Sequence, residues 1–233
     1  MAAAPNSNRQ LSDFLRYLAA RCDDSSERLP SLIEVGRELG MSVTTLREQM
    51  EVARAFGWVE VRPKTGMRRL PYSFSPAVRQ SLAYALAVSS DSFAQFADLR
   101  AHLESAYWYE AVALLTGEDI SQLKELVSEA QTKLAAAPPQ LPHAEHRALH
   151  LTIFKRLNQP FVHGLLEAYW DMYESAGLDV YLDLAYLGKV WQYHKKMVDS
   201  IAVGDFTSGY QAFSEHVHLI SQRERPQPNQ KFE

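Results

Sequence analysis

The chain has 233 residues, of which 46% are hydrophobic and 22% are charged, and its formal net charge at pH 7 is −4. This composition excludes a largely disordered chain, and the longest apolar stretches fall far short of the roughly 20 residues that a membrane crossing needs. The single cysteine, Cys22, excludes an intrachain disulfide and a cysteine-rich zinc site. We therefore expect a protein of the cytoplasm with one large domain or two ordinary ones.

The charge is distributed unevenly along the chain. Residues 1–70 contain 11 Lys and Arg against 9 Asp and Glu, whereas residues 71–233 contain 13 against 19. A modest positive balance is therefore confined to the first part of the chain. That balance permits binding to nucleic acid but does not demand it.

The first part of the chain begins with two short helical patterns. Apolar residues recur at helical spacing in "LSDFLRYLAARC", and a second helix, "LPSLIEVGRELG", ends at Gly40. Ser42 is a good N-cap for a third helix, "VTTLREQMEVARAFG", in which Leu46, Met50 and Ala53 form an apolar stripe. Two helices joined by a tight turn that contains glycine are typical of a helix-turn-helix.

A strand pair follows these helices. "WVEVR" alternates in the manner of a strand, "PKTG" supplies turn residues, and "MRRL" can return as a second strand. The helices and the hairpin together predict a winged helix-turn-helix over residues 1–70, whose second helix would enter the major groove of DNA. The candidate DNA contacts are Thr44, Thr45, Arg47, Lys64 and Thr65. The alternative is that these are ordinary solvated residues of a protein-binding module.

The rest of the chain contains only helical patterns. After a linker at residues 71–76, we expect an antiparallel bundle of six to seven helices over residues 77–223, followed by a flexible tail at residues 224–233. The fold class is therefore mainly α. The expected helices span residues 76–89, 92–117, 119–136, 142–158, 160–177, 180–203 and 205–223.

Histidines recur on three of the expected helices. His146 and His150 are one turn apart and could chelate one ion together, whereas His143, next to the helix start, is expected to be exposed. His216 and His218 are two residues apart, so they cannot face the same way. Imidazoles from several helices of a bundle are a common way to hold a divalent cation. The alternative is that they are packed polar residues without a metal.

A metal-dependent hydrolase is a rival interpretation of the same histidines. "HRALH" has the two-histidine spacing of zinc proteases, but Arg147 stands where that motif needs its general-base glutamate. Glu145 lies on the other side of His146 and would point away. We therefore expect no enzyme activity.

The first part of the chain resembles the DNA-binding domain of GntR-type bacterial repressors. The resemblance covers about residues 10–70 and is carried by the "LPS" entry, Gly40 and Ser42 in the turn, "TLRE" in the recognition helix and "GW" before the wing. Two typical DNA contacts of the family are missing, because Leu32-Ile33 replaces Glu-Arg and Val43 replaces an arginine. We therefore expect weak, salt-sensitive binding of operator DNA.

The second part resembles the helical ligand-binding domain of the FadR branch of GntR regulators, the FCD type, over about residues 77–223. "HRALHLTIFKRLN" matches the family's Asp-x-x-x-His motif and its later asparagine, and further histidines match as well. The resemblance implies metal ligands at His146, His150, His194 and His216. It implies effector contacts at Arg100 and Asn158, with Glu104 one turn after Arg100. Alternatively, Arg100 and Glu104 form an ordinary pair on the helix surface.

His146 occupies the position of the family's aspartate. Four neutral imidazoles would leave a divalent site with a net charge of about +2 instead of about +1, which favours an anionic effector, and they suit Zn, Ni or Co better than Mg or Mn. We expect Zn or Ni. The resemblance thus implies a homodimeric transcription regulator, such as a repressor, that responds to a small carboxylate. The alternative is a sensor whose effector is the cation itself.

Overall fold

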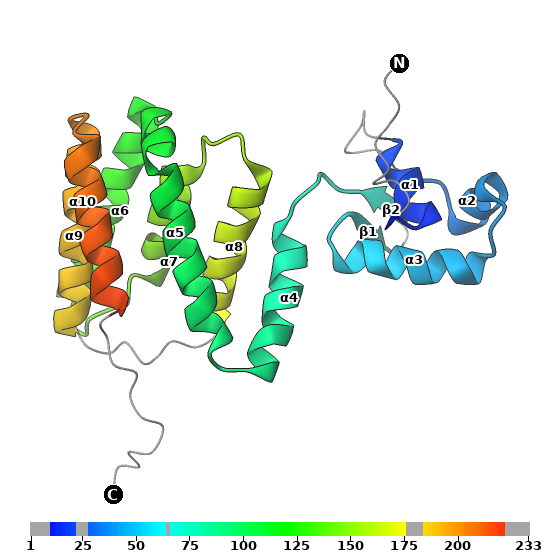
Figure 1. The fold of residues 1–233 in the computed structure, drawn as a ribbon, viewed down its shortest axis with the longest axis horizontal. Coiled ribbons are helices and arrows are strands. Elements are labelled where there is room, and N and C mark those ends of the chain that lie inside the picture. The colour runs from blue at the N-terminus through cyan, green and yellow to red at the C-terminus, as the bar shows by residue number, and fades with distance from the viewer. Residues whose placement is uncertain (1–9, 22–27, 64–65, 176–183, 222–233) are drawn as a thin grey trace, which may run out of the picture. The chain divides into compact units, whose positions relative to one another are not determined.

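The computed structural model of the chain describes residues 10–21, 28–63, 66–175 and 184–221. Its contacts divide the chain into an N-terminal unit, Met1–Ser90, and a helical unit, Asp91–Glu233 (Figure 1). The fold is mainly α, as the sequence predicts, with one small sheet of two strands in the described residues. Cys22, Lys64, Thr65 and the tail expected at residues 224–233 lie outside these ranges.

The N-terminal unit is a winged helix-turn-helix built on local caps. It contains α1 (Asp13–Ala19), α2 (Leu32–Leu39), α3 (Val43–Ala55) and the wing strands β1 (Val59–Arg62) and β2 (Gly66–Arg69). Ser31 and Glu34 form a capping box at the start of α2, and Ser42 caps α3 by accepting a hydrogen bond from the Thr45 amide. Gly40 ends α2 in the left-handed conformation, with φ of 67°, so the chain turns at once into α3.

The buried core of this unit is formed by side chains of α1, α2, α3, the segment before α2 and the wing strands. The predicted stripe of Leu46, Met50 and Ala53 is buried, as is Phe14 on α1. Tyr17 is also buried, whereas Ala19, one of the apolar residues at helical spacing in the first predicted helix, is exposed. Among the described residues of the unit, the main buried cluster comprises Phe14, Tyr17, Leu18, Leu29, Val35, Leu46, Met50, Ala53, Val59 and Met67.

The wing has one backbone contact that the sequence did not predict. β1 and β2 pair antiparallel with Val59 opposite Arg69 and Arg62 opposite Gly66. The amide of Leu29 donates a hydrogen bond of 2.9 Å to the carbonyl of Met67, so the segment before α2 lies along β2. This contact joins residues far apart in the sequence, and it ties the wing to the entry of the helix-turn-helix.

Helix α4 (Ser75–Val88) belongs by its contacts to the N-terminal unit. The sequence interpretation placed a linker at residues 71–76 and this helix in the second domain. The start of α4 lies against the end of the helix-turn-helix, where Gly57 leaves room for Pro76: a Cβ atom on Gly57 would lie 2.7 Å from the Pro76 Cγ. Because Gly57 and Pro76 are far apart in the sequence, no pattern of neighbouring residues predicts this contact.

The helical unit contains α5 (Ser92–Ala113), α6 (Gly117–Ala135), α7 (His143–Phe154), α8 (Pro160–Ser175), α9 (Leu184–Ala202) and α10 (Phe206–Ser221) (Figure 1). α5 packs against α7, α8 and α10, and α9 packs against α6 and α10. α7 ends at Phe154, four residues before the predicted limit at 158, and Lys155 is its C-cap. The core is apolar and includes Trp108, Leu123, Ile153, Trp191 and Phe213.

Candidate metal centre

Three helices of the helical unit bring four histidines to one place. His146 and His150 lie one turn apart on α7, His194 lies on α9 and His216 on α10. Each of these residues offers a ring nitrogen, and the four nitrogens lie within 4.8 Å of one another. We call these four residues the histidine cluster. Within the described residues it is the group that could hold a metal ion.

The histidine cluster is buried. His150, His194 and His216 are each at most 1% exposed, and His146 is partly buried. Burial lowers the pKa of His146, His194 and His216 well below its usual range, and neighbouring positive charge lowers it further. Burial also lowers the pKa of His150, although the Glu104 carboxylate opposes that shift. The imidazoles are therefore neutral near pH 7 and keep lone pairs that can bind a cation.

Several ring nitrogens of the cluster have no hydrogen-bond partner. These are Nε2 of His146, Nδ1 of His194 and both nitrogens of His216. Buried polar groups in folded proteins are normally hydrogen-bonded, so a concentration of unpaired nitrogens needs an explanation. A divalent cation between the rings would supply it, because imidazole nitrogen is a common ligand of Zn, Ni and Cu. The residues present thus fit a metal ion.

Arg100 and Glu104 lie beside this cluster on the buried side of α5. Arg100 is 5% exposed and Glu104 is fully buried, so the alternative of a pair on the helix surface is wrong. The Nε atom of Arg100 lies 3.6 Å from Oε2 of Glu104. The guanidinium carbon of Arg100 also lies 4.4 Å from the centre of the Tyr169 ring. Burial opposes ionisation of Glu104, but Arg100 and His150 outweigh burial, and the pKa of Glu104 is lowered.

Aromatic side chains of α8 and α9 enclose the histidine cluster. The ring of Trp170 lies 4.6 Å from that of His146 and 4.9 Å from that of His150, measured between centroids. Trp191 lies 4.8 Å from His194. The aromatic run "YWDMY" at residues 169–173 thus supplies part of the wall. In the run at residues 107–109, by contrast, Trp108 is a core residue that stacks on Phe213.

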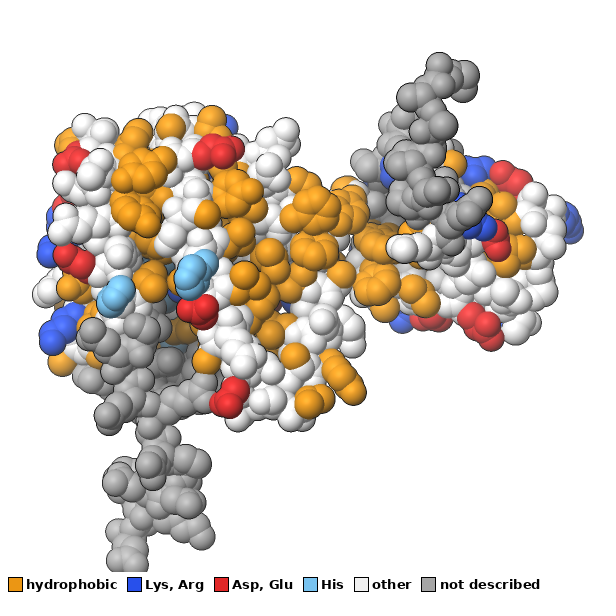
Figure 2. Space-filling model, viewed as in Figure 1, with side chains coloured by type: hydrophobic (Ala, Val, Ile, Leu, Met, Phe, Trp, Pro, Cys, Tyr) orange, Lys and Arg blue, Asp and Glu red, His pale blue; other side chains and the backbone are white. Residues whose placement is uncertain are grey.

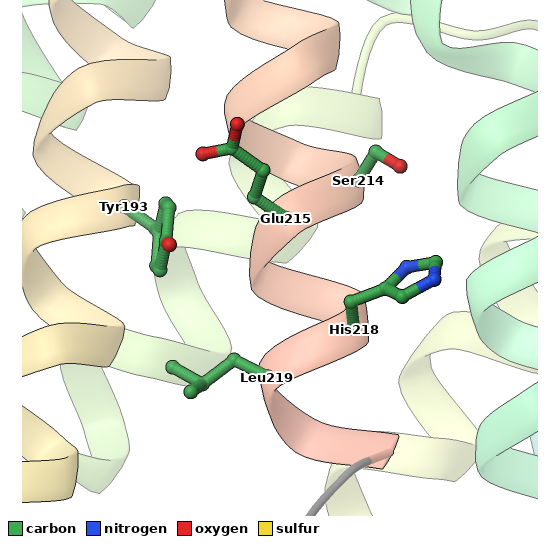
Figure 3. Close-up of a pocket in the computed structure, with 5 residues that line it drawn as sticks. All are labelled: Tyr193, Ser214, Glu215, His218 and Leu219. Atoms are coloured by element: carbon green, nitrogen blue, oxygen red, sulfur yellow. The ribbon is translucent and has the colours of Figure 1, made fainter.

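The other candidate residues of the helical unit lie elsewhere. Asn158 is exposed in the segment between α7 and α8, so the structure does not bring it into the buried cluster. His143 is half-buried rather than exposed, and its ring meets Tyr173 edge-on at 6.4 Å. His218 is exposed on α10 and lines a surface pocket (Figure 3). The other lining residues of that pocket are Tyr193, Ser214, Glu215 and Leu219.

The charged neighbours of His146 on α7 are engaged in other contacts. Glu145 Oε1 lies 2.5 Å from Nζ of Lys133 on α6, and Arg147 pairs with Asp171 on α8 at 2.9 Å. A hydrolase with this histidine spacing would need a carboxylate free to act as a general base. Glu145 is instead buried in an ion pair, which argues against the hydrolase alternative.

The candidate DNA contacts of α3 lie on its exposed side. Thr44, Thr45 and Arg47 are exposed near the start of the helix, while Leu46 between them is buried. The hydroxyl of Thr45 lies 2.9 Å from that of Ser42, so the N-cap also orients this threonine. Figure 2 shows Lys, Arg, Asp and Glu side chains interspersed on the visible face of both units, without one continuous basic patch. This agrees with the small positive balance of residues 1–70.

The chain thus combines a winged helix-turn-helix with a helical unit that contains the histidine cluster. Residues 95–219 match the FCD domain family, which is more than half of the chain. The chain belongs to the GntR-type transcription regulators that carry an FCD domain.

Several solved structures are similar to this chain, and two of them are aligned over most of its length. "Streptococcus agalactiae GntR" is 18% identical, with a TM-score of 0.65, and the alignment covers 88% of this chain and 94% of that one. "E. coli McbR/YncC" is also 18% identical, with a TM-score of 0.50 and coverage of 90% and 94%. At this identity the likeness establishes the fold. No curated protein matches the sequence. Among the described helices, none is both long and apolar enough to span a membrane.

Proposed function

We propose that the protein is a DNA-binding regulator whose helical unit senses a small organic acid through a divalent cation held by His146, His150, His194 and His216. The observation that carries the proposal is the convergence of these four ring nitrogens within 4.8 Å in a buried site, with several of them unpaired. Zn and Ni are the expected ions, because the set contains no oxygen ligand. When bound, the cation would supply a positive centre that attracts a carboxylate.

The charges around the cluster support an anionic effector. The four imidazoles are neutral, and the charges of Arg100 and Glu104 offset each other. A divalent cation in this site would therefore keep a net charge of about +2, which favours an anion from solvent. Arg100 is the proposed second contact of the effector carboxylate. Asn158 is also proposed to contact the effector, from the exposed segment between α7 and α8. An effector can shift the equilibrium between two conformations of the protein only if it binds them with different affinities.

In the N-terminal unit, Thr44, Thr45 and Arg47 are proposed to contact operator DNA from α3. Arg47 can bind a guanine edge with two hydrogen bonds or clamp a phosphate, and the exposed amides at the helix start suit phosphate oxygens. Lys64 and Thr65 are proposed as wing contacts from the sequence alone. A homodimer of the cytoplasm that represses by binding a palindromic operator is the arrangement that this class of regulator suggests.

The proposal is tested first by metal analysis. Protein purified without a histidine tag or chelator is supplied with Zn or Ni and then dialysed. A stoichiometric content of the ion supports the proposed site, whereas a content far below one ion per chain contradicts it. Operator binding with the cation alone, and then with a panel of mono- and dicarboxylates, separates an acid-responsive regulator from one whose effector is the cation itself.

A further inference from the structure

We propose that Glu104 is a positioning residue for the metal site, which fixes the tautomer and orientation of His150 so that its Nε2 atom faces the cation. This inference rests on the proposed function, because it assumes that the histidine cluster holds a metal. Its basis is the 3.0 Å contact between Glu104 Oε1 on α5 and Nδ1 of His150 on α7. Both side chains are at most 1% exposed, so water cannot replace either partner.

The contact determines which nitrogen of His150 carries the proton. An ionised carboxylate can only accept a hydrogen bond, so Nδ1 of His150 carries a proton and donates the hydrogen bond to Glu104. The Nε2 atom of His150 then keeps its lone pair. It lies 3.2 Å from Nε2 of His194, which must donate in the metal-free protein. The lone pair of His194 is then on Nδ1, and Nδ1 is the atom of His194 that has no partner. The direction of the hydrogen bonds is therefore consistent from Glu104 to His194.

Carboxylates that accept a hydrogen bond from a metal-ligating imidazole hold the ring in place and raise its basicity, and their loss typically lowers metal affinity 10- to 100-fold. Glu104 accepts from His150 through Oε1, and its second carboxylate oxygen, Oε2, lies 3.6 Å from the Nε atom of Arg100. Arg100 and Glu104 thus form one buried pair, but their charges act on the cation in opposite directions.

This opposition provides a matched pair of variants. Glu104→Gln and Arg100→Gln break the same ion pair and each leaves one charge buried without its partner. Glu104→Gln leaves the positive charge of Arg100 beside the site and removes the strong acceptor of His150. Arg100→Gln leaves Glu104 in place, with its negative charge unopposed. A purely structural role of the pair would make both variants lose metal to the same extent.

The experiment measures the Zn affinity of the full chain by competition with a chromophoric chelator. We expect Glu104→Gln to bind Zn about 10- to 100-fold more weakly, and Arg100→Gln to bind it at least as tightly as the unaltered protein. The double variant contains neither charge and so avoids an unpaired buried ion. It should also lose at least about tenfold in Zn affinity, even if Glu104→Gln alone fails to fold.

Two outcomes overturn the role of Glu104. In the first, the Zn affinity of Glu104→Gln stays within about threefold of that of the unaltered protein. If Glu104→Gln is unfolded, the same result for the double variant counts. The other is an equal loss in Glu104→Gln and Arg100→Gln. The role is also tested without metal, because nitrogen NMR of the imidazoles should show His150 as the Nδ1–H tautomer, and the Nε2–H tautomer would contradict it. Failure of the unaltered protein to take up either Zn or Ni would instead overturn the proposed function itself.

Discussion

The imidazole of His146 meets the indole of Trp170 edge-on, with ring centroids 4.6 Å apart. Tyr173 and Trp191 also face this imidazole, at 6.1 Å each. His146 is therefore held on several sides by aromatic rings, and its Nε2 atom is buried without a hydrogen-bond partner. This is the position at which the resemblance to the FCD family predicts an aspartate. Aromatic rings thus surround the imidazole that stands at this position.

Replacing His146 by aspartate should change the metal preference of the site. A carboxylate oxygen is a harder ligand than imidazole, so His146→Asp should raise the affinity for Mn relative to Zn or Ni. The net charge of a loaded site would fall from about +2 to about +1, and carboxylate binding should weaken accordingly. Competition between Zn and Mn, followed by titration with a dicarboxylate, checks both effects. An unchanged preference would show that His146 is not a ligand.

His216 should contribute to metal binding at a cost to stability. Its side chain is fully buried and neither nitrogen has a partner. His216→Leu should therefore stabilise the metal-free protein by about 1–3 kcal/mol, the usual cost of an unsatisfied buried polar group. Zn at about 100 times its dissociation constant should stabilise the unaltered protein by about 2.7 kcal/mol but should not stabilise this variant. Urea unfolding with and without Zn measures both quantities.

The matched control for this variant is His218→Leu. His218 lies two residues further along α10 and is exposed. Its replacement should leave the response to Zn unchanged, because His218 is not part of the histidine cluster. Equal effects of the two variants would contradict the assignment of His216 to the site.

The metal-free protein should lose stability as the pH falls below about 6.5. The pKa values of His146, His194 and His216 are lowered in the folded protein by burial. Between the unfolded pKa and these lowered values, the unfolded chain binds protons that the folded chain does not, so unfolding is favoured by acid. Each of these histidines contributes up to about 1.4 kcal/mol per pH unit.

Unfolding free energies measured in chelator at about pH 7.5, 6.5 and 5.5 check this dependence. His216→Leu should give a shallower slope, because it removes one of the histidines whose pKa is lowered by burial. A free energy of unfolding that rises on acidification in this range would contradict the prediction.

The charge of α3 should set the salt dependence of DNA binding. Val43 is the first residue of α3 and stands where the resemblance to GntR regulators predicts an arginine. If Val43→Arg adds a phosphate contact, the slope of log affinity against log salt should become steeper by about 0.9 on a duplex of arbitrary sequence. Arg47→Ala should weaken binding and, if Arg47 clamps a phosphate, make the slope shallower by a similar amount.

Fluorescence anisotropy of labelled duplex at several salt concentrations measures these slopes. The Zn affinity of both variants should equal that of the unaltered protein, since the substitutions lie in the N-terminal unit. A slope of the unaltered protein as steep as about −8 would contradict the expectation of weak binding.

The sequence alone determined the local structure and the candidate ligands. Ser42 and Gly40 mark the ends of two helices because capping depends on side chains within a few residues. His146 and His150 share one side of α7 because a helix repeats every 3.6 residues, and the same geometry places His216 and His218 on different sides. The resemblance to FCD domains then indicated His194 and His216 as further members of the set.

Only the tertiary structure decided how these residues act together. Helical spacing could not distinguish a surface pair of Arg100 and Glu104 from the buried pair that contacts His150, because that contact joins α5 to α7 across the core. Likewise, only the structure shows that Pro76 at the start of α4 packs against Gly57. Contacts between residues far apart in the chain depend on how whole helices pack. No window of neighbouring residues contains that information.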